Sequence, residues 1–289
     1  DDESIYGSTA YQIKFGEAVE KKLLTDYKVV VLTVQEDALQ DRLPSLESDQ
    51  GVNARTLEPS DIGKIIGCWK GLIDHGEGAP EDATGLGDML VVDDMAKIDA
   101  DAAPLHRAVG FCSTIDASKT ICEAFTQIID DYADDASGNL PLRCDLRHVD
   151  GNMPADRRAR NIAWLGEDVA DDECRILTNA RCLAEGIDVP NLDAVIFFNA
   201  KNSTVDVVQA VGRVMRRAEG KDYGYIILPI FVPAGMTPEE ALAIRWHMGG
   251  YDDAAKSFIG GRTQSNAYEK VPLCAALNLA DTYAAHFRA

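Results

Sequence analysis

Residues 194–229, AVIFFNAKNSTVDVVQAVGRVMRRAEGKDYGYIILP, contain the pattern that decides the fold. An apolar run over 194–198 is followed by helical spacing over 205–217 and by a second apolar run over 224–229. Short runs of β-branched and aromatic residues predict buried strands, and apolar residues three and four apart predict a helix. The segment therefore predicts a strand–helix–strand unit whose strands lie parallel in one sheet.

The same alternation extends over most of the chain. Strands are also expected at 28–34, 108–112, 144–149 and 175–178, and helices at 61–73, 116–132 and 154–165. This rhythm is typical of an α/β domain with a mainly parallel sheet flanked by helices. Two polar and glycine-rich stretches are predicted to be the least ordered parts, at 35–60 and at 76–101. The second stretch contains one candidate strand at 89–92. Helical spacing at 236–248 and 272–286 predicts C-terminal helices.

Composition limits the classes of function. The chain has 289 residues and a formal net charge of −20, which argues against unspecific nucleic-acid binding by the whole surface. Two basic islands stand out: residues 143–160 have five arginines against three aspartates, and residues 201–221 have five basic residues against two acidic ones. The seven cysteines form no CxxC pair, so we expect no metal site and a reduced, cytoplasmic protein. No apolar run is long enough to span a membrane, and no signal peptide is expected.

Two arginines mark the helix predicted at 205–217. Gln209, Gly212, Arg213 and Arg216 stand at a spacing that would place both guanidinium groups on one helix face. Forked, permanently charged donors suit phosphate oxygens, and Gly212 permits a close approach. The alternative is a solvated helix face without a ligand.

A second motif precedes this helix, over residues 177–190. Gly186 permits a tight turn, and the carboxylate of Asp188 can accept hydrogen bonds from the vicinal hydroxyls of a ribose. The alternative is that Asp188 only accepts bonds from backbone amides of a turn before Pro190.

Together these segments resemble motifs V and VI of superfamily 2 helicases. The resemblance implies a RecA-like fold in which Gly186 and Asp188 lie near the ribose of ATP. It also implies that Arg213 and Arg216 reach the γ-phosphate, with Arg216 as the favoured arginine finger. Gln209 would position the attacking water or the phosphate.

Further segments resemble the nucleic-acid contacts of that family. Ser113 and Thr114, in FCST at 111–114, resemble motif IV, although a helix cap is an equally good explanation of their hydroxyls. Thr178 is expected to contact a phosphate at the end of its strand. Residues 148–158, HVDGNMPADRR, resemble the next segment of such domains, and Arg157 or its neighbour would bind a backbone phosphate.

Half of an ATP site is absent from this sequence. It contains no GxxxxGK[ST] phosphate loop and no acidic box that would hold Mg²⁺. We therefore expect ATP and Mg²⁺ to be bound mainly by an N-terminal RecA-like domain of the same polypeptide. Residues 1–27 would be the linker from that domain, 28–235 the C-terminal RecA-like domain and 236–289 a helical extension. The chain alone is expected to be inactive.

The resemblance is strongest to the restriction-enzyme branch, which includes type III and single-polypeptide type I enzymes. Residues 10–31, 66–72, 179–188 and 220–228 carry it. It implies a motor that translocates on or unwinds double-stranded DNA. Three alternatives remain. The first is an RNA helicase, although DEAD-box proteins usually have histidine at the position of Gln209. The second is a non-catalytic module that binds a nucleotide or nucleic acid, and the third is a doubly wound domain for another nucleotide, which would need a glycine-rich fingerprint after the first strand.

Overall fold

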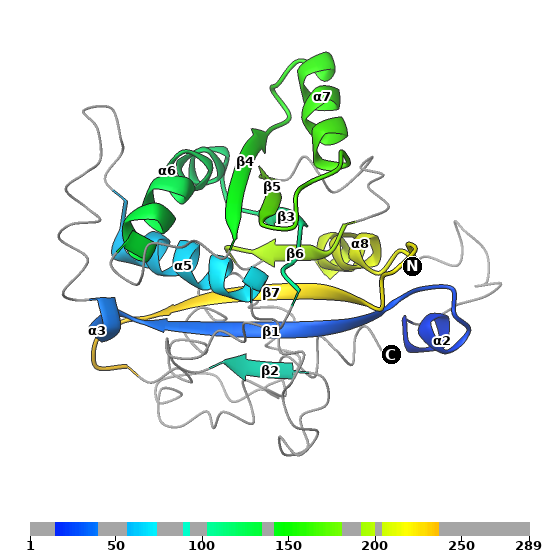
Figure 1. The fold of residues 1–289 in the computed structure, drawn as a ribbon, viewed down its shortest axis with the longest axis horizontal. Coiled ribbons are helices and arrows are strands. Elements are labelled where there is room, and N and C mark those ends of the chain that lie inside the picture. Colours follow the sequence, from blue (N-terminus) through cyan, green and yellow to red (C-terminus); the bar gives the residue numbers. More distant parts are fainter. Residues whose placement is uncertain are drawn as a thin grey trace, which may run out of the picture.

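The computed structural model describes residues 15–39, 57–73, 89–92, 103–134, 142–180, 192–199 and 204–236. Their seven strands form one sheet in the order β2-β1-β7-β6-β3-β5-β4, and all neighbours are parallel (Figure 1). The strands are β1 (Asp26–Gln35), β2 (Met89–Val92), β3 (Arg107–Phe111), β4 (Arg143–Val149), β5 (Glu173–Asn179), β6 (Ala194–Phe197) and β7 (Tyr223–Val232). The parallel sheet confirms the predicted fold class.

Helices cover both faces of the sheet. The described helices are α2 (Phe15–Glu20), α3 (Glu36–Leu39), α5 (Pro59–Ile73), α6 (Ile115–Asp134), α7 (Ala155–Leu165) and α8 (Thr204–Val214). Helices α5 and α6 bury their apolar sides on one face, and α7 and α8 bury theirs on the other. This two-sided cover explains why the central strands β6 and β7 are almost continuously apolar, whereas the edge strand β4 is not.

Alternation along each strand divides the core into two layers. In β3, Ala108 packs on the α5/α6 face and Val109 on the α7/α8 face. The rings of Phe111 and Phe197, from adjacent strands, stack with their centroids 5.5 Å apart on the second face. The central strands β3, β5 and β6 are therefore buried from both sides and hold their ends in fixed positions.

Helix α5 lies close to the sheet because glycines face it. A Cβ atom on Gly71 would stand 2.4 Å from Leu32 Cδ1 and 3.1 Å from Ile227 Cγ2. At Gly67 the nearest atoms, on Pro229 and Val34, would be 3.2 Å away. Gly71 is therefore required for this close approach, whereas Gly67 leaves slightly more room.

The predicted loop at 35–60 was wrong at both ends. Gln35 still belongs to β1, which pairs with β7 over its whole length, and Glu36–Leu39 forms the short helix α3. Helix α5 starts at Pro59, two residues before the predicted start, because proline suits the first turn of a helix. The candidate strand at 89–92 is confirmed as β2, which pairs with β1.

Of the RecA-like domain predicted at 28–235, the structure describes 28–39, 57–73, 89–92, 103–134, 142–180, 192–199 and 204–235, and its first strand, β1, begins at Asp26. The helices predicted at 236–248 and 272–286 lie outside the described residues. Among the helices that are described, none has the length and apolar character needed to cross a membrane.

Candidate functional site

Three neighbouring strands end together at one edge of the sheet. Phe111 at the end of β3 is in register with Asn179 of β5 and with Phe197 of β6. The segments that follow these strands are therefore neighbours. The backbone N–H of Ser113, after β3, donates to Asn199 Oδ1, after β6, over 3.1 Å. This carboxyl edge is where open parallel sheets bind ligands.

Ser113 and Thr114 are both exposed at this edge, directly before α6. The backbone N–H of Ala117 donates to Thr114 Oγ1 over 3.0 Å, which is the bond of an N-terminal helix cap. The capping role is thus confirmed for Thr114. The hydroxyl hydrogen is not used by that bond, so the contact with nucleic acid stays a prediction.

Thr178 does not have the position that its prediction requires. Its side chain is fully buried, and its hydroxyl donates to the backbone carbonyl of Ser118 over 3.2 Å, with the carbonyl of Arg147 at 3.4 Å as a second acceptor within reach. The register of β5 between β3 and β4 places this side chain under α6. The hydroxyl of Thr178 therefore joins α6 to the sheet and does not face the carboxyl edge.

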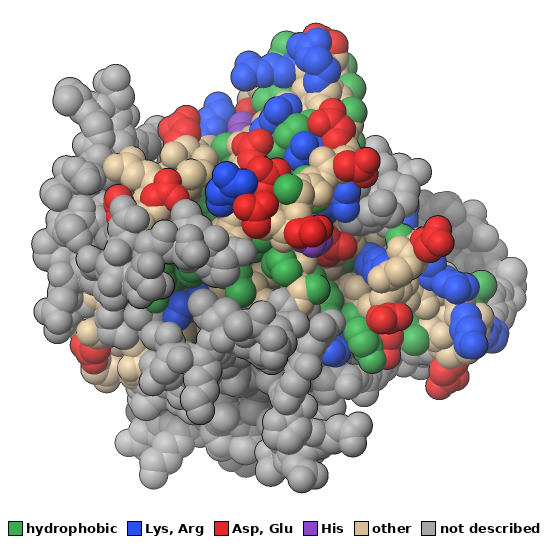
Figure 2. All heavy atoms as spheres, in the orientation of Figure 1, with side chains coloured by type: hydrophobic (Ala, Val, Ile, Leu, Met, Phe, Trp, Pro, Cys, Tyr) green, Lys and Arg blue, Asp and Glu red, His purple; other side chains and the backbone are tan. Residues whose placement is uncertain are grey.

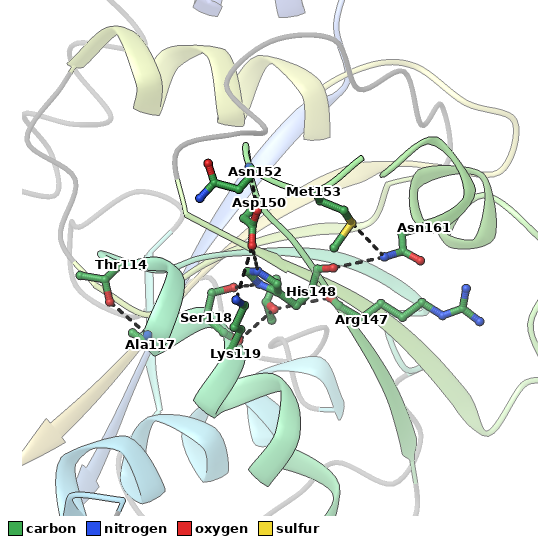
Figure 3. A network of polar contacts seen from close by, with 11 residues as sticks. Thr114, Ala117, Ser118, Lys119, Arg147, His148, Asp150, Asn152, Met153 and Asn161 are labelled. Atoms are coloured by element: carbon green, nitrogen blue, oxygen red, sulfur yellow. Dashed lines mark hydrogen bonds and ion pairs between the residues drawn. The ribbon is translucent and has the colours of Figure 1, made fainter. Parts of the chain in front are cut away.

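A polar network behind this edge was not predicted from the sequence (Figure 3). His148 lies between Ser118 and Asp150: its Nδ1 is 2.7 Å from Ser118 Oγ, and its Nε2 is 3.0 Å from Asp150 Oδ2. Asp150 also accepts the backbone N–H of Asn152 over 2.8 Å and lies 3.7 Å from Lys119 Nζ. The network therefore ties the first turn of α6 to the end of β4.

The electrostatics of this network favour a charged carboxylate. The hydrogen bond with His148 lowers the pKa of Asp150 most, burial acts in the opposite direction, and the N–H of Asn152 lowers it further. The only sequence signal was the histidine two residues before an aspartate. Ser118 could not be found in this way, because it is thirty residues upstream of His148.

Helix α7 presents arginines beside this network. Arg157 and Arg160 are exposed, and Arg160 pairs with Asp156 at 3.0 Å. Figure 2 shows Lys and Arg side chains gathered where α7 projects from the molecule. Arg147 lies 4.3 Å from the ring centroid of Trp164 and so packs on the aromatic face instead of joining this group. Arg157 thus has the exposure that a phosphate contact requires.

Helix α8 has one buried and one accessible side. Its buried residues are Val207, Ala210, Val211 and Val214. Gln209 is exposed and Arg213, one turn later, is half-buried, so these two share the side away from the core. The structure brings these two predicted residues together.

The prediction that Arg216 lies on the same helix as Arg213 is wrong. The helix ends at Val214, and the backbone N–H of Arg216 donates to the carbonyl of Arg213 over 3.2 Å, a tighter turn. Arg216 is exposed just beyond that end. Donors from other segments meet the backbone at this point: Lys221 Nζ bonds to the carbonyl of Val214, the last residue of α8, and the N–H of Thr25 bonds to that of Met215 over 2.8 Å.

Lys221 is enclosed by the groups that it joins. Its ammonium also donates to the carbonyl of Leu192, before β6. Burial lowers the pKa of Lys221 to about 8, while the carboxylate of Asp193 acts in the opposite direction.

Gly186 and Asp188, the residues predicted near a ribose, lie outside the described residues.

Comparison with known proteins identifies this arrangement. Residues 93–218 match the model of the helicase conserved C-terminal domain. The chain carries a helicase C-terminal domain. A solved structure titled "ATP-dependent Type ISP restriction-modification enzyme LlaBIII bound to DNA" is 41% identical to it, with a TM-score of 0.65, and covers 83% of this chain and 14% of that one. This similarity agrees with the predicted resemblance to the helicase domains of the restriction-enzyme branch.

Two further proteins are similar to this chain. A nuclease-deletion mutant of the Type ISP restriction-modification enzyme LlaGI, in complex with a DNA substrate mimic, is 27% identical, covers 87% of this chain and 12% of that one, and has a TM-score of 0.43. A protein of Sulfolobus islandicus filamentous virus (isolate Iceland/Hveragerdi), named as a helicase, is 32% identical over 65 residues, which are 22% of this chain and 12% of the relative. The chain spans about one seventh or less of the length of these relatives.

Three of the predicted site residues carry cationic or amide donors. Gln209, Arg213 and Arg216 offer donors of the kind that phosphate oxygens accept. Within the described ranges, no group of three or more His, Cys, Asp or Glu side chains is arranged to hold a metal ion. The donor set suits the polyphosphate part of a nucleotide.

Proposed function

We propose that this chain is the C-terminal motor domain of an ATP-dependent DNA helicase or translocase, in which it supplies motifs IV to VI. The similarity to LlaBIII, which is titled as ATP-dependent and DNA-bound, extends over 83% of the chain and supports this proposal. The observation that carries it is the pair of arginines at the end of α8, one half-buried on the helix and one exposed just beyond it.

The arginines would act on phosphate charge. Arg216 would reach the γ-phosphate as an arginine finger, and Arg213 would hold a neighbouring phosphate oxygen, because a guanidinium group presents paired donors to such oxygens. Gln209, one turn before Arg213, would orient the attacking water or the phosphate. Gly186 and Asp188 would lie against the ribose.

A second domain of the same polypeptide would complete the site. The sequence contains no phosphate loop and no acidic box, so ATP and Mg²⁺ would be held mainly by an N-terminal RecA-like domain. When bound there, Mg²⁺ would neutralise charge on the β- and γ-phosphates. The purified chain alone should release no phosphate above background.

Duplex DNA would lie along the carboxyl edge. Ser113 and Thr114 are exposed there, and Arg157 extends the edge with an exposed cation on α7. With a net charge of −20, binding must depend on such local cations. The motor would work in the cytoplasm, where a restriction-type enzyme meets incoming DNA.

Arginine substitution in the full-length protein tests this function. Arg216→Ala should lower ATP turnover by about 10³-fold, whereas ATP affinity should change little, because the guanidinium mainly meets charge that develops in the transition state. Arg143→Ala is the matched control: this exposed arginine pairs with Asp172 at 3.0 Å, at the amino end of β4, and its loss should leave turnover unchanged. If only Arg213→Ala removed turnover, the two roles would be exchanged; if neither change mattered, the proposal would be wrong.

A further inference from the structure

The turn that carries the arginines is held from two sides. We call residues 213–217 the arginine turn. Its backbone carbonyls, not its side chains, receive donors from a residue after the turn and from a segment near residue 25. Because the carbonyls define the path of the backbone, these bonds determine where the side chains of Arg213 and Arg216 begin.

Lys221 forms the first clamp. Its ammonium bridges the carbonyl of Val214, the last residue of α8, and the carbonyl of Leu192, just before β6. A positive group at a helix C-terminus also interacts favourably with the helix dipole. Lys221 therefore joins the arginine turn to the strand that follows the segment with Gly186 and Asp188.

The segment before β1 forms the second clamp. The N–H of Thr25 donates to the carbonyl of Met215, and Arg217 Nη1 donates to the carbonyl of Lys22, both over 2.8 Å. Lys22 has a φ of 56°, a left-handed conformation that is uncommon outside glycine. It ends α2, and the N–H of Leu23 closes that end on the carbonyl of Ala18 over 2.8 Å.

We propose that Lys221 and Arg217 are positioning residues for ATP hydrolysis, which hold the arginine turn against β6 and against the end of α2. This inference rests on the function proposed above. It separates the roles of three basic side chains that the sequence presents together: Arg213 and Arg216 address the nucleotide, and Arg217 binds the protein backbone. Because α2 belongs to the segment predicted to come from the N-terminal domain, a movement of that segment would shift the arginine turn.

Hydrogen exchange in the purified chain tests the clamp itself. Lys221→Met keeps the aliphatic stem and removes the ammonium, so the backbone amides of Arg216 and Thr25 should exchange about tenfold faster or more, the scale of a lost hydrogen bond to a charged group. Lys64→Met is the matched control, because Lys64 pairs with Asp61 within α5 at 3.1 Å and lies on the other face of the sheet. Unchanged exchange in Lys221→Met would overturn the inference.

Turnover in the full-length protein tests the consequence. Lys221→Met should lower kcat for ATP by about tenfold or more and leave KM within about threefold, since the groups that contact ATP are retained. Lys221→Arg, which keeps the charge and the donors, should recover part of that loss. If Lys221→Met does not fold, the exposed Arg217→Gln serves in its place, with the same expected direction.

The two proposals fail in different ways. Turnover that is insensitive to Arg216→Ala would refute the proposed function. Turnover that falls with Arg216→Ala but not with Lys221→Met or Arg217→Gln would refute the positioning role and leave the proposed function standing.

Discussion

Replacing His148 by alanine should destabilise the domain through two buried partners. Ser118 is fully buried, and its hydroxyl would lose the 2.7 Å bond to Nδ1. Asp150, 5% exposed, would lose the 3.0 Å bond to Nε2. A buried hydroxyl left without a partner costs about 1–3 kcal/mol, and a hydrogen bond to a charged group contributes about 1.5–3 kcal/mol.

Local compensation should reduce this sum. The Ser118 hydroxyl can turn to the carbonyl of Thr114 one turn earlier in α6, and Asp150 keeps the N–H of Asn152 at 2.8 Å. We therefore expect His148→Ala to lower the free energy of unfolding by about 2–3 kcal/mol, or Tm by about 5–10 °C. His106→Ala is the comparison, because His106 Nδ1 has one bond, to the carbonyl of Glu173 at 2.8 Å, and its loss should cost about 1 kcal/mol.

The pH dependence of the difference identifies its source. Because the pKa of Asp150 is lowered in the folded protein, its contribution to stability is complete above the ordinary carboxyl pKa of about 4. It is lost as the pH falls through the lower folded value. Urea unfolding at pH 7 and at about pH 3 should thus show a smaller difference between wild type and His148→Ala in acid. An equal difference at both pH values, or a loss no larger than that of His106→Ala, would refute this reasoning.

Two further substitutions test the packing and the surface. Gly71→Ala should lower the free energy of unfolding by about 1–2 kcal/mol, since the clash with Leu32 and Ile227 outweighs the gain of up to about 1 kcal/mol in helix propensity. Gly67→Ala should be close to neutral. Equal urea midpoints for the two variants would contradict this prediction. Arg157→Ala should weaken binding of a duplex DNA to the purified chain and reduce the salt slope by about one, measured by fluorescence anisotropy. Binding of an RNA duplex of the same sequence in preference to DNA would instead favour an RNA helicase.

The sequence alone predicted the elements whose signals are local. The apolar runs of the strands and the helical spacing of α5 to α8 depend on residues a few positions apart, and a buried parallel sheet uses such runs directly. The motif spacing from Gly186 to Arg216 likewise indicated the family. A register prediction was not possible, because nothing local shows that β1 pairs with both β2 and β7.

Only the tertiary structure decided what each polar side chain faces. Thr178 stands at the predicted strand end, but its hydroxyl is buried because α6 packs over β5. Helix α8 ends at Val214, although its pattern continues to residue 217, and at this end Lys221 and Thr25 donate to the carbonyls of Val214 and Met215. These donors come from seven residues later and from near the start of the chain. Tertiary contacts between distant segments can override local helix propensity. For this reason, only the folded structure could show that Arg213 and Arg216 do not share a helix face.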